Sequence, residues 1–171
     1  MSVSNDLNHE PSQPIIAVKV NVKPSSKNLR TIEQKLECLR KAISNSKEHI
    51  EAGDPTRIYS QYIRYALNQF DYLNFCASSE ASDLKQDCIH EHVVPHAIVM
   101  AKLLALDSLT DENIMSILNK FYFICKITKE EDKRLNAAGL KSAMPPEWNS
   151  ENDSIFARYE HKNVGIFILK N

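Results

Sequence analysis

Apolar positions along this chain fall into long stretches with helical spacing, separated by short polar or proline-containing breaks. From residue 29 to 50 the apolar side chains recur every three or four residues, which is typical of one face of an amphipathic helix. Gly53 ends this stretch, and Asp54-Pro55 begins a second helical stretch that extends to Leu73. Because so few residues separate the two, the pattern predicts an antiparallel helical hairpin.

Later stretches predict further helices with a strand between them. Residues 97–106 are apolar on nearly every side, so we expect a central buried helix. Thr110 can cap the helix that follows, and residues 122–127 have the composition of a strand. Thr128-Lys129-Glu130-Glu131 has the form of a capping box, and it predicts a helix that reaches Ala138.

The two ends of the chain favour short strands. Residues 15–22 form a β-branched run bounded by prolines, which predicts an edge strand. Residues 165–169 can form a last short strand, and residues 1–14 are polar and predict a mobile tail. We therefore expect one globular domain over 15–171. Its predicted class is α+β and predominantly helical, with an N-terminal edge strand, a long helical hairpin, a central buried helix and a small C-terminal strand and helix region.

Composition and charge limit the choice of partner. The 171 residues are 43% hydrophobic and 25% charged, which is ordinary for a globular protein, and the formal net charge is −1 with a pI near 6.6. The chain as a whole therefore lacks the positive field that draws proteins to nucleic acid or anionic lipid. Contact with DNA or RNA would have to be local.

The cysteines and the N-terminus predict a cytoplasmic protein with no membrane partner. Four cysteines are spread along the chain without a CxxC pair, as is typical of reduced thiols. The first ten residues have neither a basic start nor an apolar run, and nowhere do eighteen apolar residues follow one another.

The segment from Cys88 to His96 concentrates three of the six histidines beside a thiol and a carboxylate. If Cys88–His92 is extended, Cys88, His90 and His92 share one face and Glu91 lies on the other. Pro95 suits the first turn of the following helix, which would place His96 at that helix's N-terminus.

Two interpretations of this segment remain open. Cys88, His90, His92 and His96 are ligand types that zinc prefers, and His161 could close such a site from the far end of the chain. Alternatively, the histidines are structural and form hydrogen bonds at a junction between a strand and a helix, while His161 lies on the surface.

His90-Glu91-His92-Val93-Val94-Pro95 resembles the first block of the HNH (ββα-metal) nucleases, and residues 127–136 resemble the short helix that closes that motif. The resemblance implies that His92 is the general base, that Glu91 binds a divalent ion, and that His90 and His96 support them. It implies Asp132 or Asn136 as the ligand from the closing helix. We therefore expect Mg, Mn or Zn in a set formed by Glu91, His90, His96 and Asn136, with His92, Glu91 and His90 as the catalytic residues.

The sequence leaves two functional hypotheses. One is a small metal-dependent nuclease that acts on DNA or RNA, and the local chemistry favours it narrowly. The other is a non-catalytic helical module that binds another protein, as bacterial or phage regulators and inhibitors do, and the near-neutral charge and the expected exposed aromatic residues favour this one. In either case, the helix over 29–50 could cover its own core or form a dimer seam.

Overall fold

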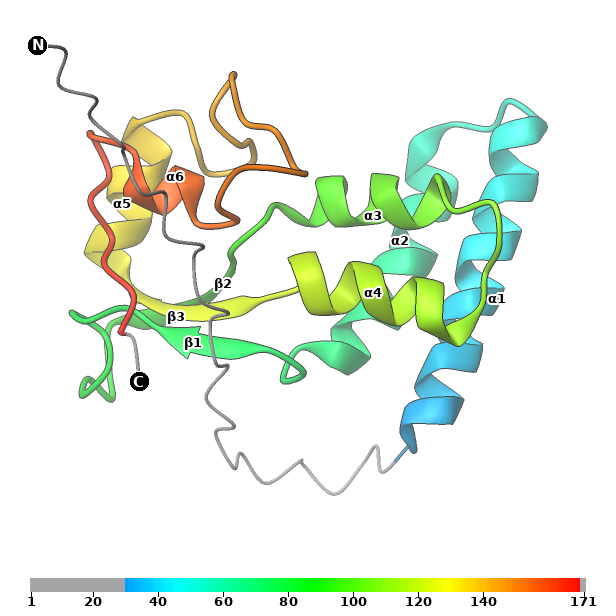
Figure 1. Cartoon of the computed structure of the whole chain (residues 1–171), viewed down its shortest axis with the longest axis horizontal. Helices are drawn as coiled ribbons and strands as arrows, with labels where there is room; N and C mark the ends of the chain where they lie inside the picture. Colours follow the sequence, from blue (N-terminus) through cyan, green and yellow to red (C-terminus); the bar gives the residue numbers. More distant parts are fainter. Residues whose placement is uncertain (1–29, 170–171) are drawn as a thin grey trace, which may run out of the picture.

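The computed structural model describes residues 30–169, so the predicted tail and the edge strand over 15–22 lie outside the described residues. Figure 1 shows a group of helices beside a small sheet, with further helical segments on the far side of that sheet. In chain order the elements are α1 (Ile32–Glu51), α2 (Thr56–Leu67), a 3-10 turn η1 (Asn68–Phe70), β1 (Phe75–Ala77), β2 (Cys88–His92), α3 (His96–Leu104), α4 (Asp111–Phe121), β3 (Ile124–Thr128), α5 (Lys129–Ala137) and α6 (Ala157–Glu160).

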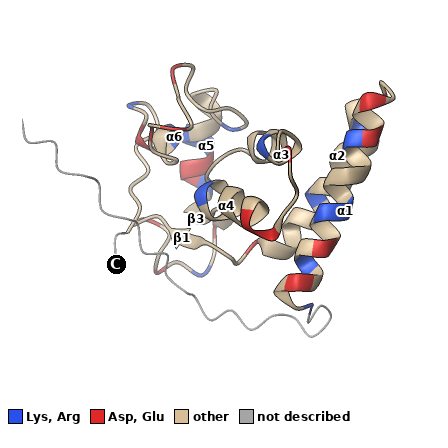
Figure 2. Ribbon diagram, turned by 45° about the vertical axis from the view of Figure 1, so that its right-hand side comes forward, with Lys and Arg blue, Asp and Glu red and all other residues tan. Residues whose placement is uncertain are grey.

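Helices α1 to α4 enclose the larger of two hydrophobic cores. Thr31 begins α1 with a capping box, in which its hydroxyl accepts from the Gln34 N–H, and Thr110 caps α4 in a similar way. Helices α1 and α2 pack against each other as the predicted hairpin. Val94, which follows β2, also belongs to this core. Acidic and basic residues are interleaved along the outer side of α1 (Figure 2), as on a solvated helix.

The three strands have the order β1-β3-β2, with β1 parallel and β2 antiparallel to β3. In register, Phe75 and His92 flank Ile124 on opposite sides, and His90 pairs with Lys126. Directly paired residues lie on the same face of a sheet, so these five side chains share one face.

The other face of the sheet covers the second core. Its strand residues include Cys125 and Ile127, which are fully buried. Helix α5 and the C-terminal segment supply the opposing side chains. Val93 belongs to this core while its neighbour Val94 belongs to the first, so the turn after β2 joins the two cores.

The α+β, predominantly helical class is confirmed, and three details differ from expectation. Helix α2 ends at Leu67 rather than at Leu73, and Phe75 lies in β1, where it pairs with Ile124. Helix α3 buries only Val99 and Leu103 completely, because neighbouring helices cover one side of it. Residues 165–169 make one isolated bridge, Ser78 with Ile168, rather than a full strand.

Candidate functional site

Strand β2 presents its histidines and its carboxylate on opposite faces of the sheet. His90 and His92 share the face described above, and Glu91 shares the other face with Ile89. Helix α3 then begins at His96, whose ring lies edge-on to that of His92 with the ring centroids 5.6 Å apart. The structure thus brings His92 and His96 together and directs Glu91 away from both.

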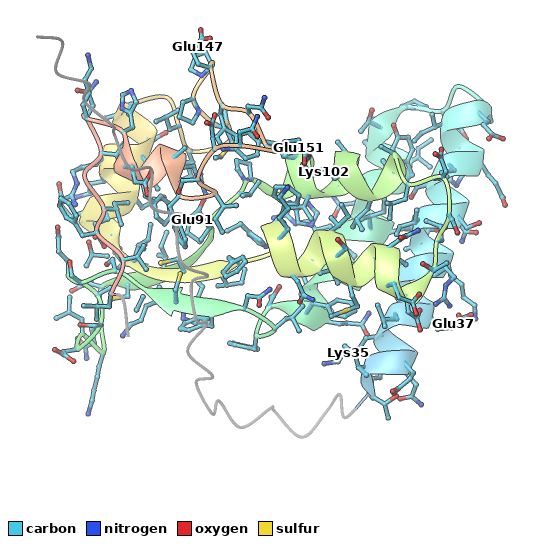
Figure 3. All side chains as sticks on the ribbon, viewed as in Figure 1. Lys35, Glu37, Glu91, Lys102, Glu147 and Glu151 are labelled. Atoms are coloured by element: carbon cyan, nitrogen blue, oxygen red, sulfur yellow. The ribbon has the colours of Figure 1, made fainter. Side chains whose placement is uncertain are left out.

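Glu91 forms an ion pair with Arg158, a residue of α6 with no solvent exposure. The Arg158 Nη2 donates to Glu91 Oε1 at 2.8 Å and to the His92 carbonyl, and its Nε donates to the Val93 carbonyl at 2.8 Å. Its Nη1 donates to the carbonyls of Leu140 and Lys141. Glu91 lies between β2 and α6 (Figure 3), so the pair joins the strand carrying the histidines to the C-terminal segment. The charges of Glu91 and Arg158 therefore balance each other within the fold.

His92 lies at the end of a chain of polar contacts that starts at Asp71. The Tyr122 hydroxyl donates to Asp71 Oδ1 at 2.6 Å, and His92 Nε2 lies 3.4 Å from the Tyr122 oxygen, a long contact for a hydrogen bond. Because the tyrosine proton is directed at the carboxylate, its oxygen is left to accept from His92 Nε2–H. This assigns the proton of the neutral ring to Nε2 and leaves Nδ1 as the proton acceptor.

Burial sets the protonation of this centre. It lowers the pKa of His92, although Asp71 and Glu91 oppose the shift, and it lowers the pKa of His96 from 6.5 to about 4, assisted by the charges of His92 and Arg64. Burial also raises the pKa of Asp71, while the hydrogen bond from Tyr122 counteracts that change. Both imidazoles are therefore neutral near pH 7, and His92 can accept a proton there.

An exposed aromatic strip adjoins this centre on the same face of the sheet. The His90 ring lies edge-on to Phe75 at a centroid distance of 5.3 Å, and the centroid of the Tyr72 ring lies 6.2 Å from that of Phe75. His90 is exposed, Tyr72 is 58% exposed, and Phe75 beneath them is buried. The strip is thus one supporting ring with two rings that face solvent.

The expected metal ligands do not converge. Glu91 is engaged by Arg158 on the opposite face, and Asn136 is an exposed residue near the end of α5. His161 follows α6, where its Nδ1 accepts from the Asn163 N–H. Within residues 30–169, no group of three or more His, Cys, Asp or Glu side chains is placed to hold a metal ion. The residues present therefore do not fit the divalent metal that the HNH resemblance implies.

A separate hollow lies between α1 and α2. It has a volume of about 450 Å³, and Tyr62 and Tyr65 on its rim are 56% and 70% exposed. Arg30 and Lys41 also line it, and the Lys41 Nζ lies 3.3 Å from a carboxylate oxygen of Glu37. This hollow is lined mostly by apolar atoms and basic side chains rather than by groups that do acid–base chemistry.

No family model, curated protein or solved structure matches this chain. In the described part of the chain, no helix combines the length and the apolar character needed to cross a membrane.

Sequence reasoning did not identify four of the residues that shape the site. Asp71, Tyr122 and Arg158 lie far from His92 along the chain, and Arg64 belongs to α2, from which its charge lowers the pKa of His92. Each belongs to an ordinary amphipathic or loop segment, so no local spacing distinguishes it. Only the tertiary fold brings their charges beside the histidines.

Proposed function

We propose that this protein cleaves phosphodiester bonds in nucleic acid, with His92 as the general base. The observation that carries the proposal is the chain Asp71–Tyr122–His92, which supports a neutral imidazole with a free Nδ1. An oriented imidazole with a second polar group behind it is the arrangement that general-base catalysis requires. A cytoplasmic location belongs to the same proposal, and the free cysteines support it.

His92 would take the proton from the attacking hydroxyl, and Asp71 would stabilise the imidazolium that forms. Asp71 favours the charged form of His92, as its effect on the His92 pKa indicates. Tyr122 would transmit that support because its hydroxyl contacts both groups. Residues 90 and 91 take other roles than the resemblance implies: His90 belongs to the aromatic strip, and Glu91 holds Arg158.

Arg64 would stabilise the negative charge that grows on the phosphate. Its charge lowers the pKa of His92, of His96 and of Tyr122, which indicates that it faces this centre from α2. Arg64 is exposed, and within residues 30–169 it forms no ion pair with a carboxylate, so its guanidinium is available to a phosphate. No step of this mechanism requires the metal set that fails to form.

A cleavage assay with two variants tests the proposal. Wild type should cleave a mixed pool of labelled DNA and RNA oligonucleotides, and His92→Ala should lose activity by about 100-fold or more, as is usual when a general base is removed. His161→Ala is the matched control, because that histidine lies outside the centre. Equal loss in both variants, or a wild type without activity, would contradict the proposal.

The second candidate is a protein-binding module, and the hollow between α1 and α2 is the specific observation that favours it. Arg30 and Lys41 beside the exposed rings of Tyr62 and Tyr65 complement an acidic amphipathic helix from a partner. A labelled acidic amphipathic peptide should then bind wild type and lose about tenfold in affinity with Tyr65→Ala, since buried tyrosines dominate such contacts. Equal binding by a basic peptide of the same apolar pattern would exclude this candidate.

A further inference from the structure

We infer that the substrate is single-stranded RNA, recognised by unpaired bases stacking on Tyr72 and His90 beside the catalytic centre. This inference rests on the proposed function, because it names the substrate class of the same site. It comes from the aromatic strip, which the chemistry at His92 does not use.

The geometry of the strip suits the flat faces of bases. Tyr72 and His90 are exposed, and the rings of both contact the ring of Phe75. Phe75 pairs with Ile124 in the sheet, so its position is fixed. Rings that the fold already holds in place can stack on a base with little loss of conformational freedom. The bases of a duplex are stacked on one another, so only an unpaired strand can present a base to these rings.

The position of the strip places the bound strand at His92. His90 and His92 are two residues apart on one face of β2, and Asp71 directly precedes Tyr72. The charges of His92 and His90 both lower the pKa of Asp71, in opposition to its burial, which raises it. His90 and His92 are separated by about 7 Å along the strand, so the backbone of a nucleotide stacked on His90 would lie near the His92 ring.

Two cations flank this path, which suits the phosphates between the stacked bases. Lys126 pairs with His90 in register, and its amine binds the carbonyls of Ser82 and Leu84 rather than a carboxylate. The charge of Arg64, a residue of α2, also lowers the pKa of His92. Asp71 carries a negative charge that opposes phosphate binding. Its carboxylate accepts a hydrogen bond from the buried Tyr122, which directs it toward the protein interior. This local balance is what a protein with a net charge of −1 needs in order to bind a short strand.

RNA supplies the nucleophile that this centre can use. His92 Nδ1 would take the proton of a 2′-hydroxyl, the 2′-oxygen would bond to the adjacent phosphorus, and the bond from phosphorus to the 5′-oxygen would break. The leaving 5′-oxygen takes a proton from solvent, and His92 later returns its own proton to solvent, so the products are a 2′,3′-cyclic phosphate and a 5′-hydroxyl. An internal hydroxyl is already held beside the phosphorus, so the base needs no metal ligand set to position a water molecule.

Binding can be measured apart from cleavage by fluorescence anisotropy in the His92→Ala background. A labelled twelve-nucleotide oligouridine should bind at least tenfold more tightly than a duplex RNA of the same length. Tyr72→Ala should weaken the binding of oligouridine by about tenfold, whereas Tyr65→Ala, an exposed tyrosine in the hollow between α1 and α2, should leave it within twofold. Equal affinity for duplex, or equal effects of the two tyrosine variants, would overturn the inference.

Cleavage by wild type gives the second part of the test. Oligouridine should yield fragments whose masses show a 2′,3′-cyclic phosphate, and the matching single-stranded DNA should bind without being cut. Cutting of the DNA would overturn the assignment to RNA while leaving phosphodiester cleavage intact. Tight, Tyr72-dependent binding without any cleavage would overturn the proposed catalysis and leave the recognition of unpaired bases standing.

Discussion

Replacing Glu91 separates a structural role for this carboxylate from a role as a metal ligand. In Glu91→Ala the buried Arg158 loses its only carboxylate partner in the described part of the chain. Removing one partner of a buried ion pair costs about 3–5 kcal/mol. Four of the hydrogen bonds from Arg158 go to backbone carbonyls and remain, and the Glu91 side chain is 19% exposed, so we expect a cost at or just below the lower end of that range, about 2–3 kcal/mol.

The free energy of unfolding should be measured by urea denaturation and the midpoint by a thermal scan. For a protein of this size each kcal/mol lowers Tm by roughly 2–4 °C, so the expected decrease is roughly 4–12 °C. Glu91→Gln keeps an oxygen that can accept from Arg158 Nη2 and should lose about half as much. Glu147→Ala is the matched control, because Glu147 is exposed at the edge of the molecule (Figure 3) and should change stability by less than about 0.5 kcal/mol.

The outcome decides what Glu91 does. A Glu91→Ala protein that unfolds like wild type but no longer cleaves nucleic acid would refute the structural assignment and restore the metal-ligand interpretation. A protein that is destabilised as expected, with activity retained below its lowered Tm, would support the assignment.

Tyr122→Phe removes the hydroxyl between His92 and Asp71, and it should lower the cleavage rate about tenfold while costing about 1–2 kcal/mol of stability, measured by single-turnover kinetics and urea denaturation. Because the pKa of His96 is lowered in the folded protein, the unfolded chain binds more protons than the folded chain once the pH falls below 6.5. The free energy of unfolding should therefore fall by up to about 3 kcal/mol between pH 6.5 and about 4. His96→Gln should flatten that dependence. A hydrogen bond with the Cys76 thiol, together with burial, raises the pKa of Cys125. Iodoacetamide should therefore modify Cys125 more slowly than Cys88 in the native protein. Equal modification rates, measured by mass spectrometry, would contradict this prediction.

Patterns within single segments predicted most of the helices. Apolar spacing placed α1 within a few residues of its observed start at Ile32, and the capping residues Thr110 and Thr128 begin their helices as expected. These features depend on neighbouring residues, so the sequence contains them directly. The second helix was predicted to reach Leu73 because apolar residues continue at helical spacing beyond Leu67, where α2 ends, whereas β1 exists only through pairing with β3.

The same distinction applies to the candidate site. The two-residue period of a strand correctly separates His90 and His92 from Glu91. It cannot identify Arg158, which is 67 residues from Glu91 along the chain, because arginine is ordinarily a surface residue and only the fold buries it. Once that partner is known, the carboxylate beside the histidines changes from a metal ligand into part of the scaffold.

The central claim is that the neutral ring of His92 accepts a proton during phosphodiester cleavage, and the pH dependence of cleavage tests it most directly. Single-turnover cleavage of oligouridine by wild type should rise with pH along a single titration whose midpoint lies below 6.5, because burial lowers the pKa of His92. His92→Ala should lose both the activity and that titration. Cleavage that persists in His92→Ala with an unchanged pH profile would contradict the account.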